Sequence, residues 1–227
     1  MPKQQVDRLR KMWQEGQATR NCWLVIPSTL TAEAAALAGF DSVTIDMQHG
    51  LIDFSNLTPM IQAIQAHDVP VLVRPPWNEP SILMRLLDVG ADGLIVPMID
   101  DAPAAAALVA ACRYPPKGRR SSGPLRAGMV AGPDYFATAD DSMLILPMIE
   151  SVLALENLDA ILDTERIDGV YIGPADLSLA LGFPPETDSR REEHQIAVKT
   201  IVEKCRARQL VAGLHTATPA FAAAAAG

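Results

Sequence analysis

The chain has little positive charge and few aromatic residues. Its 227 residues include 19 lysines and arginines against 27 aspartates and glutamates, a formal net charge of −8, and only 5% aromatic residues. Proteins that bind nucleic acids or anionic membranes carry a basic surface, which this composition does not supply. We therefore expect no nucleic-acid partner and no membrane partner, although this composition still allows a local cationic pocket.

The chain also lacks a disulfide framework and any membrane or export signal. Its three cysteines, Cys22, Cys112 and Cys205, lie far apart without the spacing of a zinc site, so we expect buried thiols in a reducing compartment. The first seventeen residues carry charges throughout, unlike a signal peptide, and no apolar run reaches the roughly 18 residues of a membrane span. These absences favour a cytoplasmic protein, and the length and 49% hydrophobic content favour one domain over residues 1–227.

Short apolar segments rich in β-branched residues alternate with longer helical patterns, which is typical of βα units in a parallel sheet. The expected strands cover residues 22–26, 42–45, 70–73, 94–96, 143–149, 169–172 and 210–214. Helical spacing covers residues 57–64, 82–87, 102–113 and 191–208, and the tail 217–227 is either a helix or a disordered end. Two long loops are expected at 114–132 and 182–190.

Four of these strands lead into charged residues, Asp46, Arg74, Glu150 and Asp176. In a parallel barrel the active site lies where the strands end, so these side chains should converge. Glu150 and Asp176 lie one βα unit apart, and such a pair suits one hard divalent cation such as Mg²⁺ or Mn²⁺. The alternative is that each carboxylate caps the helix that follows it.

Arg74 and His49 are the other candidates for chemistry. Two prolines after Arg74 fix it at the rim, where its guanidinium can bind a carboxylate or an enolate. The alternative is a buried salt bridge to Glu150 or Asp176. His49 follows Asp46 by three residues, which suits a general base oriented by a carboxylate, although a lone histidine is more often packing or surface.

Two further features bear on the reaction type. The turn Gly173-Pro174-Ala175-Asp176 can present the backbone N–H groups of its last two residues to an anion, or is only a tight turn. All five lysines fall outside the expected strand ends, which favours activation of a carbonyl by a metal over a Schiff base. His67 and His194 fall in helices and look structural, and His215 ends a strand without an evident partner.

These residues, in this order, resemble the HpcH/HpaI aldolases, metal-dependent (class II) pyruvate aldolases of the phosphoenolpyruvate/pyruvate barrel superfamily. The resemblance rests on Ala38-Gly39-Phe40-Asp41, Ile45-Asp46-Met47-Gln48-His49-Gly50, Val73-Arg74-Pro75, Leu87-Asp88-Val89-Gly90-Ala91, Val96-Pro97, the run from Arg113 to Arg120, Ile149-Glu150 and the run from Ile172 to Ser178 with Leu181-Gly182. It implies a (β/α)8 TIM barrel whose eighth strand and helix are missing from these 227 residues. We therefore expect the intact protein to continue by roughly 20 to 30 residues.

The resemblance also implies roles for individual residues. Glu150 and Asp176 would hold Mg²⁺, Mn²⁺ or Co²⁺, Arg74 would stabilise a pyruvate enolate, and His49 with Asp46 would act as the base. Asp88 would help complete the site of a neighbouring subunit in a hexamer built as a trimer of dimers. The turn Gly173, Pro174, Ala175 and Asp176 would bind the pyruvate carboxylate.

The implied reaction is reversible cleavage of a 4-hydroxy-2-oxo acid to pyruvate and an aldehyde. The alternatives are oxaloacetate decarboxylation, a malyl-type lyase on the same barrel, or a non-catalytic barrel that binds a carboxylate. Three positions depart from the common family pattern: Gln48 replaces a glutamate, Met148 replaces a glutamine, and Ser121 replaces the glycine that ends a Gly-x-Arg-Gly loop expected to close the site.

Overall fold

The computed structural model describes residues 2–226, so the terminal residues 1 and 227, which the predicted domain and tail include, lie outside the described residues. The strands are β1 (Asn21–Leu24), β2 (Ser42–Asp46), β3 (Val71–Arg74), β4 (Gly93–Val96), β5 (Leu144–Ile149), β6 (Gly169–Ile172) and β7 (Val211–Leu214). They follow the chain order in the sheet, and the pairs from β1 to β4 and from β5 to β7 are parallel. The seven predicted strands are therefore confirmed. The described residues form seven strands and not a closed ring of eight, so closure of a (β/α)8 barrel stays a prediction.

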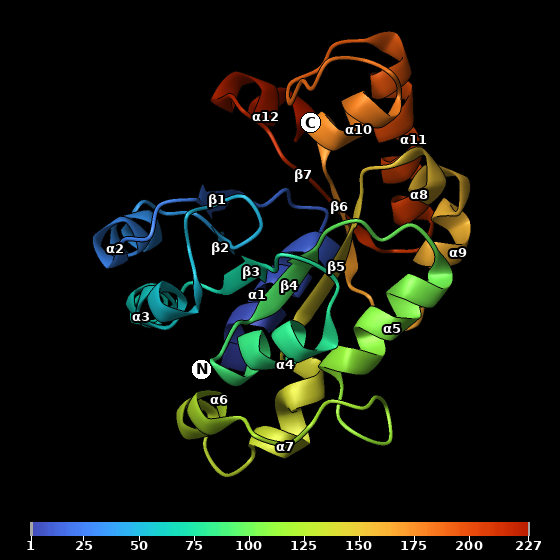
Figure 1. Ribbon diagram of the computed structural model, residues 1–227. Helices are drawn as coiled ribbons and strands as arrows, with labels where there is room; N and C mark the ends of the chain where they lie inside the picture. The colour runs from blue at the N-terminus through green and yellow to red at the C-terminus, as the bar shows by residue number, and fades with distance from the viewer. Residues whose placement is uncertain (1, 227) are drawn as a thin grey trace. The chain divides into compact units, whose positions relative to one another are not determined.

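Helices separate the strands (Figure 1). They are α1 (Pro2–Gln14), α2 (Thr29–Leu37), α3 (Phe54–Gln65), α4 (Pro80–Asp88), α5 (Ala102–Cys112), α6 (Leu125–Ala131), α7 (Tyr135–Thr138), the 3-10 turn η1 (Ala139–Asp141), α8 (Val152–Glu156), α9 (Leu158–Leu162), α10 (Pro174–Ala180), α11 (Glu192–Ala207) and α12 (Pro219–Ala225). None of the helices described is both long and apolar enough to cross a membrane.

The four helices predicted from apolar spacing are confirmed as α3, α4, α5 and α11, and the tail forms α12. The predicted loop 114–132 is partly wrong, because α6 begins within it at Leu125. Helices α8, α9 and α10 were not predicted, since segments of five to seven residues are too short to display a helical repeat. Helix α2 escaped prediction because alanines fill its buried face.

The chain forms two compact units. The first comprises 1–95 with 108–144 and contains β1 to β3 and most of β4; the second comprises 96–107 with 145–227 and contains most of β5 with β6 and β7. In the first unit every residue of β2 is buried, and α2 and α3 lie side by side on the outer side of the strands (Figure 1). Such nearly continuous burial is typical of parallel strands that are covered on both faces.

A repeated device anchors the amino-terminal ends of the strands. Three aspartates that immediately precede a strand accept a backbone N–H from the beginning of the preceding βα unit. The pairs are Asp41 with Arg20 (2.7 Å), Asp92 with Val71 (2.9 Å) and Asp168 with Ile145 (2.8 Å). Each aspartate follows, by two residues, a position in the left-handed backbone region: Gly39, Gly90 and Arg166. The turn that ends each helix thus delivers a carboxylate that ties neighbouring strands together.

Asp92 is the most buried member of this set, with 1% of its surface exposed. Its Oδ2 accepts hydrogen bonds from the Val71 N–H and, at 3.1 Å, from Gln65 Nε2. Burial raises the pKa of Asp92 to about 7, against the lowering effects of these bonds and of the Arg126 charge. The carboxyl group therefore binds its proton more tightly in the folded chain than in the unfolded chain.

This difference predicts a pH-dependent effect of Asp92→Asn. The ordinary pKa of aspartate is near 3.9, so the wild type should lose stability as the pH rises from about 4 to about 7. The uncharged variant keeps one acceptor oxygen for both bonds and avoids that loss, so above about pH 7 it should be more stable by about 1 kcal/mol or more. Urea unfolding at several pH values measures the difference.

The control is Asp53→Asn, since Asp53 is an exposed N-cap whose pKa its hydrogen bonds to Ser55 and Asn56 lower. The stability difference between Asp53→Asn and the wild type should change with pH only in the acidic range. A stability difference for Asp92→Asn that does not change between about pH 4 and 7 would contradict the raised pKa of Asp92.

Candidate active site

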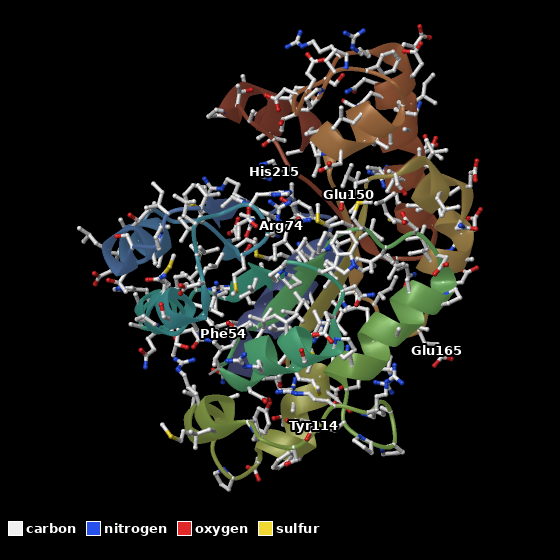
Figure 2. The ribbon with its side chains drawn as sticks, in the orientation of Figure 1. Phe54, Arg74, Tyr114, Glu150, Glu165 and His215 are labelled. Carbon is white, nitrogen blue, oxygen red and sulfur yellow. The ribbon has the colours of Figure 1, made fainter. Side chains whose placement is uncertain are left out.

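In the first unit, Asp46 and Arg74 form an ion pair between neighbouring strands. Asp46 and Arg74 are register partners at the last positions of β2 and β3, so their side chains lie next to each other. Arg74 Nε donates to Asp46 Oδ1 at 2.8 Å and Arg74 Nη2 donates to Oδ2 at 2.5 Å. Figure 2 shows Arg74 at the carboxyl end of β3. The predicted alternative of a salt bridge from Arg74 to Glu150 or Asp176 is wrong, because the carboxylate that pairs with Arg74 is Asp46.

Trp23 of β1 completes this arrangement. Its Nε1–H donates to Asp46 Oδ2 at 3.3 Å, and the Arg74 guanidinium carbon lies 4.9 Å from the centre of its ring. Burial raises the pKa of Asp46, but the hydrogen bonds and charge of Arg74, together with two backbone N–H donors, outweigh it and lower the pKa overall. Asp46 is therefore a fixed carboxylate, and the sequence reasoning missed Trp23 because strand pairing alone brings it there.

The same carboxylate shapes the turn that carries His49. Asp46 Oδ1 accepts the backbone N–H groups of Gln48, at 3.0 Å, and of His49, at 3.3 Å. Gly50 is required because a Cβ there would lie 2.2 Å from the Asp46 carbonyl oxygen. The imidazole itself is exposed, and within residues 2–226 no hydrogen bond joins it to Asp46. The prediction that the carboxylate directly orients the ring is corrected: Asp46 orients the backbone of His49, because Arg74 and Trp23 occupy its oxygens.

Glu150 is the central group of the second unit. It follows β5, only 3% of its surface is exposed, and its Oε1 accepts the Met98 N–H at 2.8 Å. Met98 takes a left-handed backbone conformation, φ 54°, which non-glycine residues adopt at some cost. The alternative that Glu150 caps the following helix is wrong, because Ser151 is the N-cap of α8 and accepts the Ala154 N–H.

Gly173 leaves room for the Glu150 carboxylate. Ile149 and Ile172 are register partners in β5 and β6, so the residues that follow them are neighbours. A Cβ on Gly173 would lie 2.1 Å from Glu150 Oε2 and 3.1 Å from Met148 Cε. Met148, the departure from the family's glutamine, therefore places a thioether beside this cradle.

Helix α10 presents Asp176 in its first turn, with Gly173 as the N-cap residue. The alternative that Asp176 caps this helix is therefore wrong, and its side chain is exposed. His194, on α11, is buried and lies with Nε2 3.1 Å from the Pro174 carbonyl oxygen. Because a carbonyl only accepts, this nitrogen carries the proton. His194 is structural, as predicted, and it fixes the beginning of α10.

The residues that could hold a hard cation are thus Glu150 and Asp176, on adjacent βα units of one compact unit. Among residues 2–226 no three His, Cys, Asp or Glu side chains gather into a metal-binding group. Two carboxylates suffice for a magnesium-type ion, which keeps several water or substrate oxygens. Carboxylate oxygens are the donors that such an ion prefers, so the chemistry of these two side chains fits it.

Asp88 ends α4 and pairs with Arg120, whose Nη2 donates to Asp88 Oδ1 at 2.6 Å. Closure of the loop 118–121 over a site stays a prediction. The Arg119 and Arg120 N–H groups donate to the Ala110 and Arg113 carbonyls, which ties the loop to α5 and its end.

One family model, described as HpcH/HpaI aldolase/citrate lyase, matches residues 20–226 and thus crosses both units. The chain belongs to this family. The Hydroxypyruvate/pyruvate aldolase of Rhizorhabdus wittichii is 41% identical over 96% of this chain and 86% of its own. The 4-hydroxy-2-oxo-heptane-1,7-dioate aldolase of Salmonella dublin is 39% identical over 91% and 79%. A Burkholderia cenocepacia HpcH/HpaI family protein superposes with a TM-score of 0.88 at 28% identity, over 96% and 87% of the two chains.

Other predictions about this family member concern its lysines and cysteines. No lysine of residues 2–226 ends a strand, as predicted, because they lie in α1, α11 and the loop after α5. The three cysteines are free; Cys112 and Cys205 are buried, and burial raises the pKa of each thiol to about 12. Cys22 is only half-buried, so that part of the prediction is corrected.

Gly173→Ala tests the cradle in this aldolase. The added methyl group must displace the Glu150 carboxylate, so we expect pyruvate-releasing activity to fall by at least roughly tenfold, the cost of about 1.4 kcal/mol in the barrier. The control is Gly123→Ala, where a Cβ meets nothing within 4 Å. Equal activities of the two variants, with both folded by circular dichroism, would contradict the cradle.

Proposed function

We propose that this aldolase reversibly cleaves a 4-hydroxy-2-oxo acid to pyruvate and an aldehyde, through a pyruvate enolate. The chain is a carbon–carbon lyase, in keeping with its aldolase relatives. The observation that carries the proposal is the two-bond Asp46–Arg74 pair at the carboxyl ends of β2 and β3. This pair holds the Arg74 guanidinium at the carboxyl ends of the strands, where parallel α/β proteins bind their substrates.

Arg74 stabilises the negative charge that develops when the C3–C4 bond breaks. Its guanidinium is held by Asp46 on one side and lies over the Trp23 ring, so it does not have to reorganise as charge appears. Asp46 neutralises most of its charge in the resting enzyme, which leaves hydrogen-bond direction as the main contribution. The enolate is then protonated to give pyruvate.

His49 serves as the general base that removes the C4 hydroxyl proton, directly or through water. Its imidazole is exposed at the end of β2, where a substrate can reach it. Asp46 and Gly50 set the turn on which it sits, so the carboxylate supports the base through the backbone. In the condensation direction the protonated His49 imidazole returns this proton to the C4 oxygen.

Glu150 and Asp176 hold a divalent ion, Mg²⁺, Mn²⁺ or Co²⁺. When bound, the ion supplies Lewis acidity toward the oxygens of the 2-oxo acid. The first-turn N–H groups of Ala175 and Asp176 in α10 point beyond the helix, as N–H groups at a helix start do, and receive the substrate carboxylate. Gly173 and Pro174 fix this turn beside Glu150.

Asp88 helps complete the site of a neighbouring copy in a hexamer built as a trimer of dimers. Its carboxylate lies at the end of α4, outside the strand ends, and is 23% exposed. The same proposal places the seven parallel strands in a single (β/α)8-barrel domain and the protein in the cytoplasm. The barrel is supported by strands in chain order, and the reducing compartment by three free cysteines.

A substrate panel tests the reaction. Pyruvate release, coupled to lactate dehydrogenase, should occur from 4-hydroxy-2-oxo acids and stop after chelator treatment, and Mn²⁺ should restore it. Glu150→Gln and Asp176→Asn should each reduce the restored rate at least roughly tenfold, as loss of a metal-orienting group does. Activity on oxaloacetate alone would support the decarboxylase instead, and activity that survives chelation would contradict the metal.

Solvent deuterium exchange isolates the enolate. The wild type should exchange the methyl protons of pyruvate, and Arg74→Ala should slow this exchange by about a hundredfold, the effect of removing one charge-stabilising donor. Arg85→Ala is the control, since Arg85 lies over the Phe54 ring on the outer helices α3 and α4. Normal exchange in Arg74→Ala would remove the proposed role of Arg74, and absence of exchange in the wild type would favour a non-catalytic barrel.

A further inference from the structure

Arg120 is a buried cation that the proposed reaction does not use. Its side chain is 1% exposed, although the neighbouring Arg119 is exposed in the same loop. Burying a guanidinium is costly unless its donors are bonded, and Arg120 Nε has no hydrogen-bond partner among the described residues. A chain that keeps such a group needs the contacts that its other donors make.

Those contacts converge on two groups from different elements. Arg120 Nη2 donates to Asp88 Oδ1 at 2.6 Å and to the Tyr135 hydroxyl at 2.9 Å. The guanidinium carbon lies 4.6 Å from the centre of the Tyr114 ring, and this ring meets that of Tyr135 edge-on with centroids 6.3 Å apart. Tyr114 is labelled in Figure 2, in the region of α7.

The backbone on either side of this cluster is fixed as well. The Arg120 N–H donates to the Arg113 carbonyl at 2.8 Å, and the Ser121 N–H contacts Met84 Sδ at 3.3 Å. Arg120 therefore has little freedom to move, and the orientation that it imposes on Asp88 is rigid. Asp88 in turn keeps a partly exposed carboxylate, with one oxygen bonded inward.

We propose that Arg120 and Tyr135 are positioning residues for Asp88. Arg120 binds Oδ1 and turns the remaining face of the carboxylate outward, and Tyr135 holds the guanidinium in place from the other side. The inference rests on the proposed function, in which Asp88 serves the site of a neighbouring copy. It assigns Arg120 to the support of a catalytic carboxylate and not to a loop that closes a site.

The first test compares the same substitution at adjacent positions. Lysine keeps the charge of Arg120 but cannot bridge Asp88 and Tyr135 with one planar group. Arg120→Lys should lower kcat at least about tenfold with KM changed less than about threefold, because a small displacement of a catalytic group is costly. Arg119→Lys, on the exposed neighbour, should leave both constants within about twofold. Equal kcat values for the two variants, both folded, would overturn the inference.

The second test is a double-mutant cycle, which separates positioning from a general loss of stability. Tyr135→Phe removes one hydroxyl and keeps the packed ring, so the fold should persist. It should lower kcat about threefold to tenfold in the wild-type background but less than about 1.5-fold in the Asp88→Asn background, because coupled residues are not additive. The same factor in both backgrounds would overturn the inference even if the unfolding temperature had fallen.

Asp88→Asn alone distinguishes the two proposals. If it retains wild-type kcat, Asp88 has no role in the reaction, and that part of the proposed function fails together with the inference. If it loses activity while Tyr135→Phe acts independently of it, the role of Asp88 stands and only its positioning by Arg120 and Tyr135 fails.

Discussion

Parallel pairing of successive strands is the constraint on which the candidate site depends. Because neighbouring strands run in the same direction, residues far apart in the chain end at the same edge, as Asp46 and Arg74 do. The pairing is held at the opposite edge by aspartates such as Asp92 and Asp168, which bond the N–H groups of a neighbouring strand. A shift of one residue in the strand register would turn every strand-end side chain to the other face. The aspartate hydrogen bonds that hold the register therefore also keep the candidate site residues in place.

Arg74 and Glu150, two of the candidate site charges, are each bonded by an element other than their own. Arg74 of β3 is bound by Asp46 of the preceding strand β2, and Glu150 is bound by the Met98 N–H that follows β4. Burying a charge is costly, and a partner on a neighbouring strand or loop of the same unit offsets that cost and fixes the direction of the side chain. Asp46 and Arg74 are thereby fixed within the first unit, and Glu150 within the second.

The sequence predicted the seven strands and the charged positions at their ends because both depend on local patterns of apolar and charged residues. It did not predict which groups touch. The Asp46–Trp23 hydrogen bond and the Asp88–Arg120 pair join residues 23 and 32 positions apart, and only the packed structure sets those distances. Short helices such as α10 were missed because they lack a repeat, although Gly173-Pro174 signals a helix start.

Of the two departures from the family pattern near strand ends, Gln48 changes the charge and Met148 changes only the polarity. Gln48 removes a carboxylate next to the Asp46–Arg74 pair, which leaves that pair close to neutral and the His49 turn free of an additional negative charge. Met148 removes a polar side chain beside Gly173 and Glu150, so the buried carboxylate has an apolar neighbour. In less polar surroundings an uncompensated carboxylate is more costly and its attraction to a cation is stronger. The Met98 N–H, which donates to Glu150 Oε1 at 2.8 Å, offsets part of the cost of burying this carboxylate.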